Sequence, residues 1–197
     1  MAALMQSDRV GSINIIVANS LLEKSSVIER LFSELEELVL SRDRDTVSVP
    51  LTFPSAFQWD SHLRTLHLTR AAIPLFPELL SPCTGLVDLQ LHKIPKIGYF
   101  SPNAVANALS GTHLRLLSLH FLSFTLPRNY RGLPPQSGER VILLSLTCFK
   151  SRGTSEYLDS FVARIDAPRL KDIDIRFFSQ PTMVALQLSR FINHIET

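Results

Sequence analysis

His92 and His120 are the two residues of this chain whose type and spacing come closest to metal-binding chemistry. Each directly follows a Leu-x-Leu segment. If these segments are neighbouring strands, the two imidazoles lie about one strand spacing (~4.8 Å) apart. They could then share a metal ion, with Asp88 or Cys148 as a further ligand. Protein metal sites need three or four ligands held by surrounding groups, so we interpret the two histidines as partner contacts and predict no metal.

Catalytic chemistry has even less support. Cys148 and His120 could be read as a nucleophile and its base, but nothing in the sequence indicates an activated thiolate. The sequence contains no Gly-x-Gly-x-x-Gly, Gly-Lys-Ser/Thr, His-Glu-x-x-His or Gly-x-Ser-x-Gly motif. We therefore predict no enzyme activity, no catalytic residue and no cofactor.

These residues belong to a six-residue pattern that recurs along the whole chain, with apolar residues at its first, fourth and sixth positions. The last three positions read as a short strand with alternate side chains pointing inward. About seven copies start near residues 10, 35, 63, 86, 114, 146 and 170, at intervals of 23 to 32 residues by subtraction. This pattern is typical of leucine-rich repeats. We predict an α/β fold, a leucine-rich-repeat solenoid in which residues 1–197 form a single domain.

The sixth copy has two possible alignments. Val141, Leu144 and Leu146 fit the pattern, and so do Leu146, Phe149 and Ser151, with a polar last position. We favour the second, because residues 144–151 then align with 168–175, where a turn residue also stands two positions before the first apolar one.

Between the strands, the sequence predicts helices or irregular segments on the convex side. Helices are expected at about 21–31 (Ser20 and Glu23 form a capping box), at 74–80, after the N-cap Ser101, after Thr154 or Ser155, and in a C-terminal capping segment at 181–197. The first repeat starts almost at the first residue. This predicts that the chain is the C-terminal part of a longer protein, or a shortened gene model.

Residues 126–140 are rich in proline, glycine and arginine and are predicted to be an inserted loop. Their arginines are accompanied by one tyrosine and one glutamate, which favours a solvated insertion over a nucleic-acid site. Just before them, Phe121, Leu122 and Phe124 are expected to fill the core between the fifth and sixth repeats.

A parallel sheet of this kind binds partners through the strand side chains that point away from the core. In the six-residue numbering these are the third and fifth positions and the residue after the sixth. The predicted partner-binding residues on this concave face are His67, Thr69, Asp88, Gln90, His92, Ser118, His120, Lys150, Arg152, Asp174 and Arg176. Lys150, Arg152 and Arg176 make the C-terminal end basic, which suits a protein or peptide with an acidic patch. The alternative is a solvated face without a ligand.

Composition limits the other partners. The chain has 20 basic and 18 acidic residues and a formal charge of +2, too balanced to favour nucleic acid or an anionic membrane. Cys83 and Cys148 fit reduced thiols better than a disulfide framework. There is no signal peptide and no apolar run long enough to cross a bilayer. We predict a cytoplasmic or nuclear protein that binds neither nucleic acid nor membrane.

Longer stretches carry a more specific resemblance. They include Trp59-Asp-Ser-His-Leu-Arg-Thr-Leu-His-Leu68, Leu80-Ser-Pro-Cys-Thr-Gly-Leu-Val-Asp-Leu-Gln-Leu91 and Tyr157-Leu-Asp-Ser-Phe-Val-Ala-Arg-Ile-Asp-Ala-Pro-Arg-Leu170. Together they resemble the leucine-rich-repeat region of the F-box-like protein family of mushroom-forming fungi (basidiomycetes). The resemblance implies a repeat horseshoe that captures a target for ubiquitination.

The same resemblance implies an N-terminal F-box that docks the adaptor of a cullin-type ubiquitin ligase. No F-box-like segment precedes Val10, and Ser151 stands where the family usually has an aromatic or large apolar residue. The ligase adaptor is therefore expected as a partner only if an F-box is present upstream. The alternative is a stand-alone leucine-rich-repeat scaffold, or a truncated relic with no ligase connection.

Overall fold

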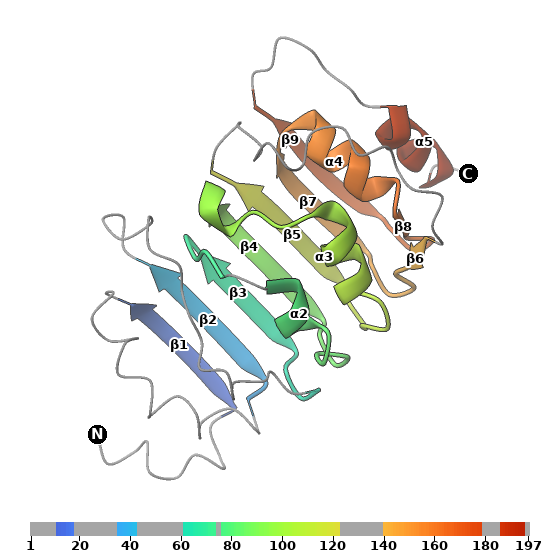
Figure 1. The fold of residues 1–197 in the computed structure, drawn as a ribbon. Coiled ribbons are helices and arrows are strands. Elements are labelled where there is room, and N and C mark those ends of the chain that lie inside the picture. The colour runs from blue at the N-terminus through green and yellow to red at the C-terminus, as the bar shows by residue number, and fades with distance from the viewer. Residues whose placement is uncertain are drawn as a thin grey trace, which may run out of the picture.

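The computed structural model describes residues 11–17, 35–42, 61–73, 76–122, 140–178 and 186–195. Within these residues, seven parallel strands form one sheet in the order β1-β2-β3-β4-β5-β7-β9, which we call the main sheet (Figure 1). The strands are β1 (Ser12–Val17), β2 (Glu37–Arg42), β3 (Thr65–Thr69), β4 (Asp88–Ile94), β5 (Leu116–Phe121), β7 (Cys148–Gly153) and β9 (Asp172–Phe177). The predicted α/β class is confirmed.

The described helices lie over one face of the main sheet (Figure 1). They are α2 (Phe76–Leu80), the 3₁₀ turn η5 (Lys96–Gly98), α3 (Pro102–Ala108), α4 (Ser155–Val162) and α5 (Leu186–Ile195). Each strand of the main sheet pairs with the main-sheet strand that comes next in the sequence. Because the pairs are parallel, the chain must cross back over the sheet between them. We call the helix side the covered face and the opposite side the open face.

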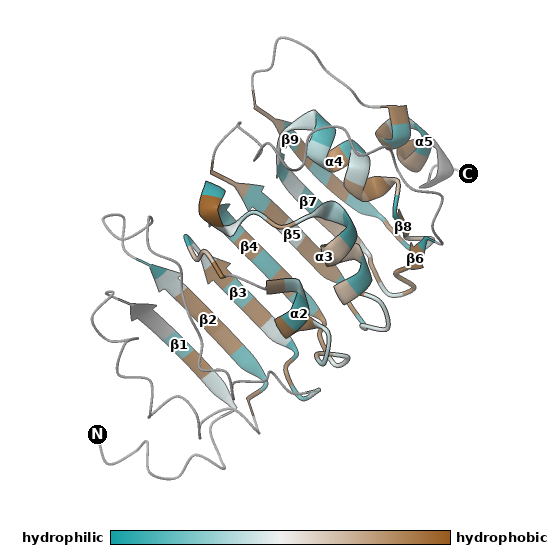
Figure 2. Cartoon of the chain, viewed as in Figure 1, coloured by the Kyte–Doolittle hydropathy of each residue, from teal (hydrophilic) through white to brown (hydrophobic). Residues whose placement is uncertain are grey.

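The apolar positions of the six-residue pattern stack across the main sheet. The fourth positions pair in register as Ile13, Leu38, Leu66, Leu89, Leu117, Phe149 and Ile173. The five from Leu38 to Phe149 are buried. Figure 2 shows hydrophobic and hydrophilic bands alternating along the strands. The predicted strand positions are confirmed, because a period of two sends alternate side chains to opposite faces.

The favoured alignment of the sixth copy is also confirmed. Phe149 pairs with Leu117, and Ser151, which is buried, pairs with Leu119. The rejected alignment nevertheless contains a strand that we did not predict. This strand, β6 (Val141–Ile142), pairs in parallel with β8 (Ile165–Asp166) in a separate two-stranded sheet.

Two helices begin at the predicted caps. The Ser101 hydroxyl accepts a hydrogen bond from the Ala104 amide at 3.0 Å, and Pro102 occupies the first turn of α3. At α4 the N-cap is Thr154, whose hydroxyl accepts from the Tyr157 amide at 3.3 Å. These bonds satisfy backbone donors that a helix leaves without intrahelical partners.

Helix α5 lies within the predicted terminal segment and packs on α4. A carboxylate of α4 caps it: Asp159 Oδ1 accepts hydrogen bonds from the amides of Gln187 at 2.7 Å and Leu188 at 3.0 Å. Leu188 and Phe191 are buried. The cap and the apolar contact together hold α5 in place, since an anion at a helix N-terminus meets unpaired amides.

One tight backbone approach fixes the entry to β4. A Cβ atom on Gly85 would overlap the carbonyl oxygen of Ser61, whereas a Cβ on Gly11 would meet nothing within 4 Å. Only glycine therefore allows the two segments to come this close without a backbone shift.

Several expectations have other outcomes. Phe121 is buried as expected, but Leu122 is 49% exposed, so the prediction that it fills the core is wrong. Leu122 follows the last inward position of β5 and its amide donates to the Ile94 carbonyl, which leaves its side chain outside the packed rows. The helix expected at 21–31, Phe124 and the inserted loop up to residue 139 lie outside the described residues.

Candidate interaction surface

All the predicted partner-binding residues lie on the described strands of the main sheet, in three rows that cross its open face, but Ser118 is buried within its row (1% exposed). The third-position row is Ser12, Glu37, Thr65, Asp88, Leu116, Cys148 and Asp172. The fifth-position row is Asn14, Val39, His67, Gln90, Ser118, Lys150 and Asp174. In the row after the sixth position, Ser41, Thr69 and His92 are in register, and His120, Arg152 and Arg176 continue it.

His92 and His120 meet face to face at the point where this third row passes from β4 to β5. Their ring centroids are 4.6 Å apart and the ring planes differ by 26°. The hydroxyl of Ser118 lies 3.2 Å from His92 Nε2. The strand spacing therefore brings the two imidazoles together as predicted, and the result is a stacked pair.

A β-bulge lies beside this pair. Leu91 pairs with Leu119, and Ile94 pairs with Phe121. Between these two pairs, β4 contains one residue more than β5. Within this bulge, the backbone of Lys93 adopts the left-handed conformation, at φ 55°. Bulges re-aim side chains at strand ends, and here the bulge follows directly after His92. No feature of the sequence pattern indicated it.

The surroundings keep both imidazoles neutral. Burial lowers the pKa of His92, and the positive charges that His67 and Lys93 can carry lower it further. Burial also lowers the pKa of His120, with further contributions from His92 and Arg152. Histidine otherwise titrates near pH 6.5, so these shifts favour the uncharged form of both rings at neutral pH.

The arrangement does not assemble the metal site that we considered. An imidazole binds a metal in its ring plane, and the stacked rings place these planes nearly parallel. Asp88 is engaged elsewhere, because it accepts hydrogen bonds from Gln90 Nε2 at 3.1 and 3.2 Å. Within the described ranges, no group of three or more His, Cys, Asp and Glu side chains is placed to hold a metal ion.

His67 also contacts Asp88, with 3.2 Å between Nε2 and Oδ2. The approach lacks hydrogen-bond geometry, and His67 Nε2 is a buried nitrogen without a hydrogen-bond partner. We treat it as an electrostatic contact.

Cys148 and His120 do not form a nucleophile–base pair. The sheet register places Cys148 beside Leu116, and His120 beside Arg152. Cys148 Sγ instead donates to Asp172 Oδ2 at 3.3 Å. Burial raises the pKa of the Cys148 thiol, and the bond to Asp172 raises it further, which disfavours the thiolate.

The basic end of the open face is partly neutralised by its own carboxylates. Arg176 donates to Asp174 through Nε at 3.1 Å and Nη2 at 3.0 Å, and this pair lowers the pKa of Asp174. The guanidinium of Arg152 lies over the ring of Phe178, 5.8 Å from its centroid. The surface is therefore less basic than the sequence suggested, but its arginines are held in place.

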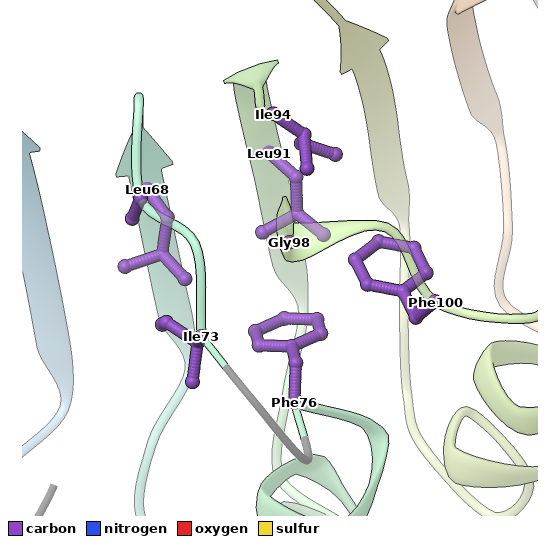
Figure 3. A pocket seen from close by; sticks show the side chains of 8 residues that line it. Leu68, Ile73, Phe76, Leu91, Ile94, Gly98 and Phe100 are labelled. Carbon is purple, nitrogen blue, oxygen red and sulfur yellow. The ribbon is translucent and has the colours of Figure 1, made fainter. Parts of the chain in front are cut away.

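A small cavity on the covered side is not a ligand site. It is lined by apolar residues of β3, β4 and the segments that follow them: Leu68, Ala71, Ile73, Phe76, Leu91, Ile94, Gly98 and Phe100 (Figure 3). Its volume of about 10 Å³ is no more than one water molecule needs. The cavity is a packing gap.

One buried charge was missed by the sequence analysis. Arg42, at the end of β2, is only 2% exposed, and burial lowers its pKa. Two residues beyond the inward Leu40, the alternation of the strand carries it to the covered face. That phase was visible in the sequence, but a charged residue at an inward position contradicts the usual pattern.

No family model, curated protein or solved structure matches this chain. In the described part of the chain, no helix is both long enough and apolar enough to cross a membrane. The three rows on the open face are the candidate site.

Proposed function

We propose that this chain is a protein-interaction module, a leucine-rich-repeat solenoid that binds a protein partner on its open face. The observation that carries the proposal is the parallel pairing of the main sheet, which lines up the third and fifth positions of successive repeats in register and brings the residues after the sixth position into a third row despite the bulge between β4 and β5. Repeat proteins of this kind use such extended surfaces for binding. The described helices all lie over the opposite face (Figure 1).

We further propose that the module is the substrate-recognition region of an F-box-type ubiquitin ligase adaptor. Support for this part comes from the resemblance to the fungal F-box-like family. In that arrangement the target lies on the open face, and the cullin-ligase adaptor is a partner only if an F-box is present upstream. A stand-alone scaffold is the competing proposal.

Site-specific photo-crosslinking tests the binding face. A photoreactive amino acid replaces Gln90 in the fifth-position row, or Asn107, an exposed residue of α3 on the covered side. Irradiation in fungal lysate should crosslink a partner from Gln90 only, and the partner, once purified, should bind the wild-type chain directly. Equal crosslinking from both positions, or none from Gln90, would contradict the proposal.

The ligase connection is tested separately. Cullin-ligase subunits should copurify with the expressed full-length protein, and depleting the protein should lengthen the half-life of the crosslinked partner. A partner that binds but neither copurifies with ligase subunits nor changes its half-life would favour the stand-alone scaffold.

A further inference from the structure

Four nitrogen-rich side chains form a continuous row at the C-terminal ends of adjacent strands. They are His92 on β4, His120 on β5, Arg152 on β7 and Arg176 on β9, and we call them the cationic row. His120, Arg152 and Arg176 are in register, and the ring stack joins His92 to them. The row itself contains no carboxylate, but Asp174 of the neighbouring fifth-position row is paired with Arg176.

The members of the row are positioned before any partner arrives. Asp174 holds Arg176 through two hydrogen bonds, and the ring of Phe178 lies beneath the Arg152 guanidinium. Ser118 contacts His92, whose ring is also fixed by the stack. Side chains already ordered lose less conformational entropy on binding than free ones.

The backbone supports the same place. Lys93 adopts φ 55° in the bulge that follows His92. A non-glycine residue in this region is strained, and such strain persists only where the surrounding structure holds it. The strain lies one residue from the histidine pair, and the carboxylates of the third-position row lie at the other ends of the strands.

We infer that the cationic row is the docking site for an extended acidic segment of the partner protein, and that docking is coupled to proton uptake by the histidine pair. This inference rests on the proposed function and names the chemistry of its partner. The ligand chemistry is that of carboxylates, which are complementary to two guanidinium groups and to imidazoles that become cationic.

The dimensions select the form of the segment. The row crosses four strands, so its length is about three strand spacings, or ~14 Å. In an extended peptide, alternate side chains lie on one side and about 6.6 Å apart, so three of them span ~13 Å. A peptide with an acidic residue at every second position therefore matches the length of the row. The peptide would run across the strands of the main sheet.

Proton uptake follows from the charges around the pair. His92 faces His67, Lys93, Lys150 and Asp88. Burial and the three bases disfavour its cationic form, and Asp88 opposes them only in part.

His120 is surrounded by His92, Arg152, Arg176 and Asp174. Burial and the three bases disfavour its cationic form, and Asp174 opposes them only in part. A bound carboxylate adds negative charge beside both rings and raises their pKa values. The complex then holds more protons than the free protein, so affinity must increase as the pH falls.

The test uses a fluorescent seven-residue peptide in which three glutamates alternate with serines, and the same peptide with glutamines. Fluorescence anisotropy measures binding to the wild-type chain at pH values from 5.5 to 8. Glutamate side chains stay largely ionised over this range. The glutamate peptide should bind at least about threefold more tightly at pH 5.5 than at pH 7.5, and the glutamine peptide should bind at neither pH.

Variants locate the binding. The pair Arg152→Gln and Arg176→Gln should weaken binding about tenfold, the loss expected when two surface charge contacts are removed. The matched control, Arg64→Gln with Arg115→Gln, removes two exposed arginines just before β3 and β5, at the opposite ends of the strands, and should leave affinity unchanged.

Replacing both histidines by glutamine should flatten the pH dependence while Arg152 and Arg176 still support binding at pH 8. Melting curves at pH 5.5 and pH 8 verify that each variant is folded. Three results would overturn this inference: an affinity that does not change with pH, equal losses of affinity in the two double arginine variants, or no binding of the glutamate peptide. Tighter binding of an oligouridylate than of the peptide would also overturn it. The crosslinking test of the open face is independent of these outcomes, so the inference can fail while the proposed function stands.

Discussion

Removing an inward leucine of the main sheet should destabilise the whole fold. Leu117 lies on β5 at a fourth position, between Leu89 on β4 and Phe149 on β7. None of its surface is exposed. Leu117→Ala deletes three carbons from this packed row, and the neighbouring strands, held by their own hydrogen bonds, cannot close the gap fully.

The size of the effect follows from transfer and cavity terms. Three carbons at about 0.8 kcal/mol each correspond to ~2.4 kcal/mol of lost burial. A residual cavity adds up to ~2 kcal/mol, so we expect a loss of about 2.5–4.5 kcal/mol in the free energy of unfolding. For a domain of this size, that lowers Tm by roughly 5–18 °C.

Differential scanning calorimetry and urea denaturation followed by circular dichroism measure both quantities. Leu66→Ala, one fully buried position on β3, should behave like Leu117→Ala. His67→Ala is the control, since its side chain, 30% exposed, lies on the open face. It should change the free energy of unfolding by less than about 1 kcal/mol. Equal losses in all three variants would refute the assignment of the two faces.

Three further predictions concern features outside the inward rows. Because the folded pKa values of His92 and His120 lie below the ordinary 6.5, the unfolded chain binds protons first on acidification. The free energy of unfolding should therefore fall below about pH 6.5 in urea titrations, and less so after replacing both histidines by glutamine. Asp159→Ala should accelerate amide hydrogen exchange in α5 and cost about 1 kcal/mol, leaving exchange in β4 and β5 unchanged. Gly85→Ala should cost about 1–3 kcal/mol in calorimetry, because the new Cβ meets a backbone carbonyl. Gly11→Ala has open space and should be nearly neutral.

Much of the main sheet could be predicted because its determinants are local. Each strand can be recognised in the sequence by two inward apolar residues and by a preceding apolar residue at which the chain turns. Even Ser151, a polar residue at an inward position, could be placed, since Phe149 and the turn before it fixed the phase. The strand β6 was missed because two residues carry too little pattern to distinguish a strand from a loop.

The helices show the same division. The caps at Ser101 and Thr154 are local and were predicted, although the choice between Thr154 and Ser155 needed the backbone path. The cap of α5 by Asp159 joins residues 28 positions apart in the chain and has no local signal. Only packing of α5 on α4 brings the carboxylate to the amides.

At the candidate site, the sequence by itself determined which residues share the open face, because side-chain alternation and repeat spacing are properties of the chain. The tertiary structure decided how those residues engage one another. It stacked His92 on His120 beside a bulge, paired Arg176 with Asp174, and separated Cys148 from His120. These outcomes depend on side-chain orientation and on a one-residue register shift, and both are settled only when neighbouring strands compete for the same contacts.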